Sequence, residues 1–514
     1  MNDDTFEELC TLTADLIESN FEKNKTKMDA ISGQISEKIA GIDMKDFLHG
    51  LSIALGNDIQ MFLLSFSALY YATSEEACLG YIESELAKGK LDILRTCAIA
   101  FQTRSNYFRR GINKEYKKDR ELNDIVAKQY FNGLNVQIPM IHYADRDHKL
   151  IVISTYMLLG ETHAPTRWVI TAVKYLQELG YEVMVVIEGY PFDIELIAQY
   201  WVGVMSIPNK IFPDGYFRVK MLGIEVPCYQ VNTYEDDRDK LTSFFGDIYS
   251  MRPELVWKIG GMYCFDKIFE SMTTYVTLAC GRGYETGTGH LMLKCLETES
   301  DGEVEDFLHS LGQETARMQF READFDEETK WHNSSLRSDN GIGEDDFVIA
   351  VVGNRLDQEL TDNFWDVLKC VVKNCEDVRI LLIGGYEKVI DDELFDKVIN
   401  MGFCEELEEG LKQIDLFVNP KRGGGGTSAK LSIKAGKPVV TLPECDVAYV
   451  VGEEFVCNDY GEMKELCIKY VDDETFYKQM SEQAKENYVR KYSFDMKEEV
   501  RKVVEKAIEI GKRQ

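Results

Sequence analysis

From His148 onward, short runs of apolar residues alternate with longer segments whose apolar residues recur every three or four positions. The first group of runs is KLIVIST, YEVMVVIEG, ELVWKIGG and TTYVTLACG, and the second is FVIAVVGN, VRILLIGG, IDLFVNP, KPVVTLP and EEFVCND. Strands that are apolar throughout and separated by helices are typical of parallel sheets covered on both faces. The alternation predicts an α/β fold with two successive doubly wound units, at residues 148–330 and 345–490.

The residues before this alternation follow a different pattern. In FEELCTLTADLIESNF, ISGQISEKIAGI, MFLLSFSALYYA and LGYIESELAKGKLDILRTCAIAF the apolar spacing is helical, and the first proline is Pro139. This predicts an all-α domain, a helical bundle of its own, at residues 1–140. Residues 491–514 predict a C-terminal helix, and the polar, acidic stretch 298–345 predicts a linker or surface segment. About three domains fit a chain of 514 residues.

Charge and composition limit the partners. A formal charge of −31 argues against nucleic acid or an anionic membrane as the main partner, but not against a small phosphorylated ligand. The longest apolar run, which starts at Met61, is shorter than the ~20 residues that a membrane span needs. Thirteen scattered cysteines and an acidic N-terminus without a leader pattern predict a cytoplasmic, soluble protein.

One segment, NPKRGGGGTSAKLSIKAGKPVVTL at residues 419–442, is unusual in so acidic a chain. Between Asp415 and Glu444 it contains no acidic residue and five basic ones: Lys421, Arg422, Lys430, Lys434 and Lys437. Glycines let backbone approach a ligand closely, and Thr427 or Ser428 could cap a following helix that Gly436 ends. Free N–H groups at a helix N-terminus bind phosphate.

Two readings of this segment stay open on chemistry alone: a phosphate-binding loop, or a tight strand-to-helix connection with a solvated basic face. The segment is not a P-loop, because the G-x-x-x-x-G-K-[ST] spacing is missing. It is not a dinucleotide fingerprint either, because it lies late in its domain and lacks G-x-G-x-x-G.

Four features of the second unit, in order, resemble the donor-binding domain of GT-B glycosyltransferases of the group 1 type. They are VVGNRLDQEL, VRILLIGG, GFCEELEEGLKQIDLFVNP and the glycine-rich segment with GKPVVT. The resemblance covers residues 148–514 as two Rossmann-like lobes, and implies a nucleotide sugar, with UDP favoured, as donor substrate and no separate cofactor. It implies the following donor contacts: Arg355, Phe403, Lys421, Arg422, Gly425, Gly426, Thr427 and Ser428.

In the first lobe, STYMLLGETHAPTRW resembles the loop that follows the first strand and faces the cleft between the lobes. The resemblance makes His163 the candidate catalytic or donor-contacting histidine; the alternative is a polar loop residue before Pro165. Arg167 could assist in phosphate binding or lie in a solvated first helical turn. The glycine-rich turns in KIGGMYCF and GRGYETGTGH, the latter with His290, fall where loops of this lobe should reach the cleft.

The mechanism implied by the resemblance needs no metal, because basic side chains and a helix N-terminus can neutralise the departing diphosphate. No H-E-x-x-H or clustered Cys/His pattern indicates zinc. DxD triplets begin at Asp145 and Asp237. An acidic chain yields such triplets readily, so we interpret both as solvated turns.

The resemblance fails at one pair of positions. Retaining enzymes of this fold commonly carry two glutamates eight positions apart around this loop. Related inverting protein glycosyltransferases keep an Asp at the second of these positions. In this sequence the two positions are Gly423 and Leu431. Leu431 cannot accept a hydrogen bond from the donor ribose, a loss of about 1.5–3 kcal/mol. Glu453 or Glu454 could serve instead.

Two classes of function follow from these observations. The first is an active glycosyltransferase that moves a hexose from a nucleotide sugar to an acceptor hydroxyl or amide. The second is a catalytically silent homologue that binds a substrate or partners an active transferase. The helical domain resembles one found before the two lobes in some bacterial protein glycosyltransferases, which implies a polypeptide acceptor; the alternative is an oligomerisation or stabilising domain.

Overall fold

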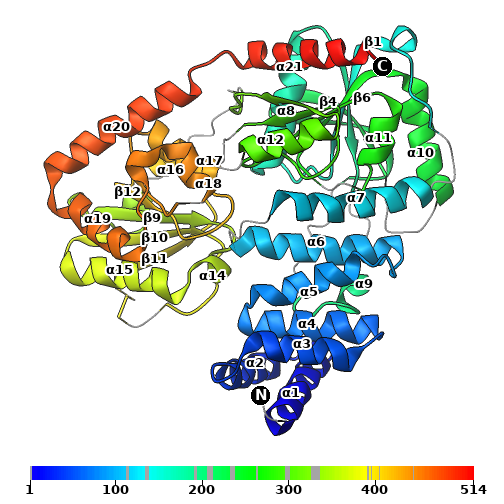
Figure 1. Cartoon of the computed structure of the whole chain (residues 1–514). Helices are drawn as coiled ribbons and strands as arrows, with labels where there is room; N and C mark the ends of the chain where they lie inside the picture. Colours follow the sequence, from blue (N-terminus) through cyan, green and yellow to red (C-terminus); the bar gives the residue numbers. More distant parts are fainter. Residues whose placement is uncertain are drawn as a thin grey trace.

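The computed structural model of the protein describes residues 3–110, 115–133, 138–189, 194–204, 212–231, 238–261, 264–295, 301–323, 325, 336–390, 393–394, 396–404, 406–443 and 445–514. Its three parts are a stack of N-terminal helices, a first α/β lobe and a second α/β lobe beside it (Figure 1). The predicted α/β fold, with two doubly wound units after a helical region, is confirmed.

The N-terminal helices follow one another with short connections. They are α1 (Asp3–Phe21), α2 (Lys25–Ile39), α3 (Met44–Leu55), α4 (Ile59–Thr73), α5 (Glu76–Leu86), α6 (Ile93–Arg110) and α7 (Tyr116–Gly133). The carboxylates of Asp43 and Asp58 cap α3 and α4 by accepting backbone N–H bonds. Helix α4 is buried on every residue from Phe62 to Tyr70, which explains why its sequence is apolar on all sides.

Helices α6 and α7 join the helical part to the first lobe. Cys97 of α6 and Tyr130 of α7 lie in the same buried cluster as Phe265 and Phe269 of the first lobe. The ring of Tyr130 packs edge-on against Phe265, with 5.3 Å between the ring centroids. The core of the helical part therefore continues into the first lobe.

The first lobe is built on an eight-stranded sheet in the order β3-β4-β2-β1-β5-β6-β7-β8, parallel except for the β3–β4 hairpin. The strands are β1 (Asp147–Thr155), β2 (Glu182–Ile187), β3 (Gly215–Met221), β4 (Ile224–Gln230), β5 (Pro253–Ile259), β6 (Thr274–Leu278), β7 (Leu291–Lys294) and β8 (Glu314–Arg317). The helices are η1 (Tyr143–Asp145), α8 (Ala164–Glu178), α9 (Ile194–Ala198), α10 (Arg238–Met251), α11 (Asp266–Met272) and α12 (Asp301–Ser310).

Alternate residues of β1 enter different cores, so both faces of this sheet are covered. Val152 lies in the cluster shared with the N-terminal helices, whereas Ile151 and Ile153 lie in the cluster on the other face. Gly180 (φ +91°) ends α8 as predicted: the N–H of Tyr181 reaches the carbonyl of Leu176, which is a Schellman motif.

The second lobe has a five-stranded, fully parallel sheet in the order β11-β10-β9-β12-β13. The strands are β9 (Phe347–Gly353), β10 (Val378–Gly384), β11 (Val398–Gly402), β12 (Leu416–Val418) and β13 (Val439–Val440). The helices are α13 (Leu336–Asp339), α14 (Leu356–Glu359), α15 (Asp362–Asn374), α16 (Leu407–Lys412), α17 (Gly426–Lys434), α18 (Asp446–Val451), η2 (Glu453–Phe455), α19 (Tyr460–Asp472), α20 (Glu474–Tyr492) and α21 (Met496–Gly511).

Three sequence predictions differ from this fold. The run EEFVCND is a 3-10 turn with a single bridge at Val456 rather than a strand, because Gly452 (φ +113°) turns the chain just before it. Strand β11 was missed, because its sequence VINMG is short, is interrupted by Asn400 and has only one fully buried residue. Residues 301–317 are not a linker: β8 adds the last strand of the first sheet, and α12 packs beside it.

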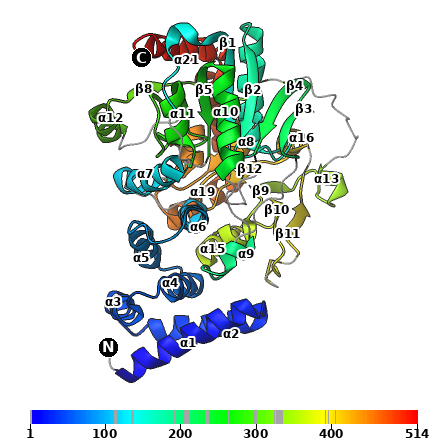
Figure 2. The same ribbon diagram turned by 90° about the vertical axis from the view of Figure 1, so that its right-hand side faces the viewer.

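The last helix crosses from the second lobe back to the first. Helix α20 lies along the second lobe, and α21 lies on the first lobe (Figures 1 and 2). Met496, Val500 and Ala507 of α21 are buried in the first lobe's core. Arg146 and Thr274, at the start of that lobe's sheet, both donate hydrogen bonds to Gln514 Oε1, at 3.0 Å.

The thirteen cysteines, all in the part of the chain that is described, form no disulfide bond. The Sγ atoms of Cys97 and Cys264 lie 3.5 Å apart, at hydrogen-bond distance for two thiols. Among the described residues no helix is both long and apolar enough to cross a membrane.

Candidate active site

A cavity of about 880 Å³ lies where the helical part and the two lobes meet. Helices α6 and α7 contribute Arg104, Phe108, Asp119 and Asn123; the first lobe contributes Tyr156, His163, Gly260 and Gly281 to Thr286; the second lobe contributes Arg355, Gly423, Asp446 and Tyr449. The lobe residues follow the carboxyl ends of parallel strands, which is where open α/β sheets bind ligands.

The glycine-rich loop after β12 is held in shape by Arg422. This side chain is 2% exposed and donates hydrogen bonds to Asn419 Oδ1 (2.9 Å), Glu359 Oε2 (2.6 Å) and the carbonyl of Val352 (2.6 Å). A Cβ on Gly425 would lie 2.7 Å from Arg422 Nη2, so the loop can close around the guanidinium only with glycine there. Arg422 is therefore buried within the loop and holds its shape. This position does not fit the predicted contact between Arg422 and the donor.

Helix α17 begins at this loop, and its N-cap lies two or three residues before the predicted one. Its N-cap is Gly425 (φ +83°), without a side-chain hydrogen bond, so the prediction of Thr427 or Ser428 as cap was wrong. The left-handed glycine already turns the chain into the helix, which places both hydroxyl residues in the first turn. A helix start without a side-chain cap leaves first-turn N–H donors for a ligand. Gly436 (φ +72°) ends the helix as predicted.

Arg355 connects this loop to the cavity. Its Nε donates to Glu359 Oε1 (3.0 Å) and its Nη2 donates to the carbonyl of Gly423 (3.1 Å). The guanidinium lies over the ring of Phe108 from α6, 5.2 Å from the centroid. One buried carboxylate, that of Glu359, thus holds both Arg355 and Arg422 against the loop.

His163 faces the same cavity from the first lobe. It is the N-cap residue of α8, and its Nδ1 lies 2.9 Å from Thr166 Oγ1. Burial lowers the pKa of His163 to about 4, so the imidazole is neutral at physiological pH. The hydroxyl of Thr166 also accepts the N–H of Leu159, at 3.0 Å, which fixes the orientation of the pair.

The order of elements and this loop match a known family. Residues 346–481 match the family described as Glycosyl transferases group 1. This part of the chain is similar to group 1 glycosyl transferases. With the first lobe and the returning helix α21, the protein has the GT-B architecture.

Solved structures with similar folds share little sequence with this chain. A mutant O-GlcNAc transferase of Thermobaculum terrenum is 12% identical, with a TM-score of 0.48 over 100% of this chain and 99% of its own. The pneumococcal O-GlcNAc transferase GtfA, in complex with UDP and GlcNAc, is 10% identical, with a TM-score of 0.44 over 71% and 99%. A glycosyltransferase from Rickettsia africae is 12% identical, with a TM-score of 0.43 over 71% and 99%.

Among the curated proteins, none matches the sequence.

The other predicted donor residues of the group 1 domain do not line the cavity. Lys421 and Glu453 are exposed, Phe403 is 61% exposed, and Gly426 and Ser428 are half-buried. Thr427 is half-buried, and its Oγ1 lies 3.5 Å from Glu322 Oε1, which also pairs with Lys430 (3.8 Å). Their contacts with a donor stay predictions.

Of the other first-lobe residues predicted to reach the cleft, some line the cavity and some do not. Gly260, Gly261 and the stretch Gly281 to Thr286 line the cavity as expected, whereas Met262 and Tyr263 lie outside the described residues. His290 does not line it: its Nδ1 accepts the N–H of Tyr275 (3.0 Å), near the start of β6 and thus at the other end of the strands from the cavity.

The remaining charged residues that the sequence singled out in this lobe are Arg167 and the two DxD triplets. Arg167 pairs with Glu322, with 3.1 Å between Nε and Oε2. In the first DxD triplet, Asp145 and Asp147 are exposed, as predicted, but Asp147 is the first residue of β1 and not part of a turn. The second triplet begins at Asp237, which lies outside the described residues.

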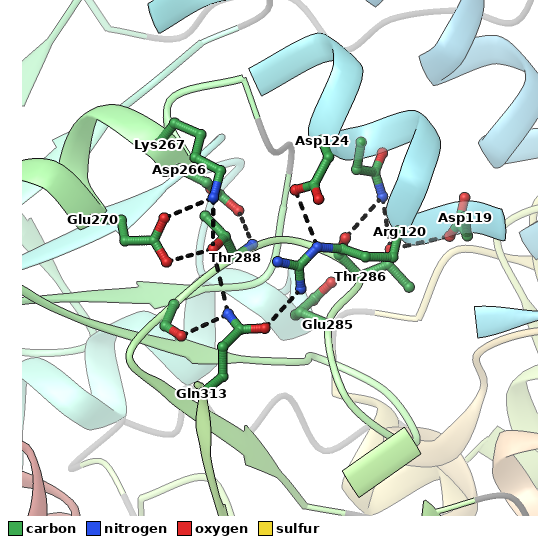
Figure 3. Close-up of polar contacts among 12 residues, drawn as sticks. Asp119, Arg120, Asp124, Asp266, Lys267, Glu270, Glu285, Thr286, Thr288 and Gln313 are labelled. Atoms are coloured by element: carbon green, nitrogen blue, oxygen red, sulfur yellow. Dashed lines mark hydrogen bonds and ion pairs between the residues drawn. The ribbon is translucent and has the colours of Figure 1, made fainter. Parts of the chain in front are cut away.

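Helix α7 holds the first-lobe loop that lines the cavity, which the sequence did not reveal (Figure 3). Asn123 Nδ2 donates to Thr286 Oγ1 (2.8 Å), and that hydroxyl donates to Asp119 Oδ2 (3.0 Å). Arg120 Nη1 donates to Gln313 Oε1 (3.1 Å). These partners are more than 160 positions apart in the chain, so no local pattern could have paired them.

Below the cavity floor lies a fully buried charge network. Lys258 Nζ, at the end of β5, is 3.0 Å from both Glu188 Oε1 and Asp266 Oδ1. Burial alone would lower the pKa of Lys258, but Asp266 and Glu188 outweigh it and raise that pKa. Burial raises the pKa of Glu188, with Lys258 opposing the shift. A Cβ on Gly261 would lie 3.1 Å from Lys258 Cε, so the floor rests directly on this network.

Proposed function

We propose that the protein is a glycosyltransferase that moves a hexose from a nucleotide sugar, with UDP as the favoured nucleotide, to a hydroxyl or amide of an acceptor. One observation carries the proposal: Arg355 and the glycine loop of the group 1 domain line the same cavity as His163 of the first lobe. Donor and acceptor would therefore meet between the lobes.

In this proposal the donor diphosphate lies against the glycine loop and the start of α17. Gly425 offers no side-chain cap, so first-turn N–H groups and the helix dipole are available to an anion. Arg355, placed beside Gly423, supplies positive charge where the leaving diphosphate forms. Fixed donors aimed at developing negative charge stabilise a transition state, and on this basis we propose a metal-independent reaction.

His163 is the proposed general base. A base at Nε2 requires that Nδ1 carries the proton and donates to Thr166 Oγ1. With a pKa of about 4, the ring stays unprotonated at neutral pH and can accept the acceptor's proton as the new glycosidic bond forms.

We propose a polypeptide acceptor, because α6 and α7 of the helical part form one wall of the cavity. The competing roles of this part, oligomerisation or stabilisation of the lobes, predict no loss of acceptor binding when that wall is altered. Intact-mass spectrometry of candidate peptides incubated with protein and donor measures transfer. Size-exclusion chromatography with light scattering reports the oligomeric state. The proposed compartment is the cytoplasm.

Isothermal titration calorimetry with UDP tests the donor half of the proposal. We expect saturable binding that is lost in Arg355→Ala. A thermal-shift panel of nucleotide sugars then identifies the donor, because a ligand that binds the native state raises the melting temperature. The absence of binding at millimolar UDP, and of a shift with any nucleotide sugar, would rule out the enzyme and leave a silent homologue.

A further inference from the structure

The two positions that carry carboxylates in similar domains carry none in this protein: they are Gly423 and Leu431. A Cβ on Gly423 would overlap the carbonyl oxygen of Phe108, so α6 excludes any side chain there. Leu431 is half-buried and packs against the second lobe's core. A hydroxyl-rich donor in this lobe therefore has to find its carboxylate elsewhere.

Asp446 is placed to supply it. Among the described residues of the second lobe, four line the cavity, Arg355, Gly423, Asp446 and Tyr449, and Asp446 is the one with a carboxylate. It is the first residue of α18, and its Oδ2 accepts the N–H of Gly424 at 2.7 Å. The carboxylate is thus attached to the glycine loop itself, one residue from the position that lacks a side chain.

Its other oxygen faces the first lobe. Arg282 Nε lies 3.7 Å from Asp446 Oδ1, and the guanidinium lies over the ring of Tyr449, 5.7 Å from the centroid. A carboxylate has about four lone-pair sites, so these two contacts leave acceptor capacity for a ligand. The side chain of Asp446 keeps 13% of its surface exposed, on the cavity side.

We propose that Asp446 accepts hydrogen bonds from hydroxyl groups of the donor hexose and thereby sets which sugar is bound. The inference rests on the proposed function. Glu453, which the sequence offered as a replacement acceptor for the donor ribose, is exposed and does not line the cavity, so it is not placed to contact the hexose either. Charged hydrogen bonds to a sugar hydroxyl correspond to about 10- to 150-fold in affinity.

The test compares UDP with UDP-hexoses. Calorimetry with UDP, UDP-glucose, UDP-galactose and UDP-N-acetylglucosamine is run on the wild type and on Asp446→Asn, which keeps an oxygen for the N–H of Gly424. We expect the variant to bind UDP as the wild type does and to lose about 10-fold or more of its affinity for the preferred UDP-hexose. A matched control is Asp459→Asn, since Asp459 also accepts a backbone N–H at a helix start but does not line the cavity.

Two results would overturn the inference while leaving the proposed function intact. One is an equal loss for UDP and UDP-hexose, which would make Asp446 a support of the loop only. The other is unchanged affinity for both ligands. If the wild type binds no nucleotide, the proposed function fails, and the role of Asp446 fails with it. A second variant, Asp446→Glu, is expected to change the ranking of the hexoses and not the affinity for UDP.

Discussion

The two lobes present loops to the same cavity but hold them by different means. The second-lobe loop is shaped by its own glycines and by Arg422, which lies within the same stretch of sequence. The first-lobe loop is fixed by Asn123 and Asp119 of α7, far away in the sequence, which both bind Thr286 (Figure 3). The difference shows that the second-lobe side of the cavity is shaped mainly by residues of that lobe, with Phe108 of α6 packed against it, whereas the first-lobe side is held by side chains of the helical part.

The largest expected effect concerns the buried network of the first lobe. Lys258→Met leaves Glu188 and Asp266 buried without their cation, so we expect a loss of about 3–5 kcal/mol in the free energy of unfolding at pH 8, measured in urea. Because the folded state of this variant raises the pKa of Glu188 further, Glu188 binds a proton more readily when folded. The loss should shrink as the pH falls from 8 to 5.

The control for this variant is the double change Glu188→Gln with Lys258→Met, which removes one of the two uncompensated carboxylates. It should recover part of the stability at pH 8 and show a weaker dependence on pH. A loss that does not change with pH would contradict the assignment of the effect to buried carboxylates.

A second prediction tests whether Arg422 holds the shape of the glycine loop. Arg422→Ala leaves Glu359 with Arg355 alone, and we expect a loss of about 3 kcal/mol in the free energy of unfolding, together with weaker UDP binding. The neighbouring change Lys421→Ala removes an exposed cation and should alter stability by less than ~0.5 kcal/mol. Equal effects of the two changes would mean that the loop keeps its shape without Arg422.

A third prediction concerns His163 and pH. The folded pKa of about 4 lies below the ordinary value of 6.5, so the histidine stabilises the folded state fully above pH 6.5, and this contribution is lost as the pH falls toward 4. Between pH 6.5 and pH 4, we expect the free energy of unfolding of His163→Gln to fall by about 3 kcal/mol less than that of the wild type. The exposed His49→Gln is the control, and identical pH profiles of His163→Gln and the wild type would contradict the prediction.

The pH dependence of the transfer rate is a second test of His163. We expect the wild-type rate to hold down to about pH 5, because the base stays unprotonated there, and His163→Gln to abolish the acid limb along with most of the activity. An acid limb centred near 6.5 would show that another group is the base.

The smallest expected effect is on the contact between α7 and the first-lobe loop. Asn123→Ala removes the hydrogen bond to Thr286 and should cost about 1 kcal/mol of stability, with weaker acceptor binding and unchanged UDP binding. Asn374→Ala, on an exposed helix end of the second lobe, is the control. If Asn123→Ala weakened UDP binding as strongly as acceptor binding, the division between the two sides of the cavity would be wrong.

Local chemistry explains which parts of this molecule could be predicted from the sequence. Gly180 and Gly436 end helices as expected, since a left-handed glycine is a requirement of the nearest few residues. The α/β alternation also predicted both sheets, because fully buried strands have to be apolar. Arg422 was misjudged, since its charge suggests a ligand and only the fold shows Glu359 beside it.

Asp446 and Asn123 were missed for a related reason. Nothing in the residues around Asp446 shows that its carboxylate reaches Gly424, and nothing around Asn123 points to Thr286. Both contacts depend on how distant segments pack. A helix start a few residues after a parallel strand was the one available signal for Asp446.

The return of α21 to the first lobe has a consequence for how the protein is made. The surface of that lobe that receives Met496, Val500 and Ala507 exists early in synthesis, but its cover is translated only after the entire second lobe. At ~5–20 residues per second, this apolar surface stays open on the order of ten seconds on every ribosome. The nascent chain is therefore most in need of a chaperone at its first lobe, long after that lobe has left the ribosomal exit tunnel.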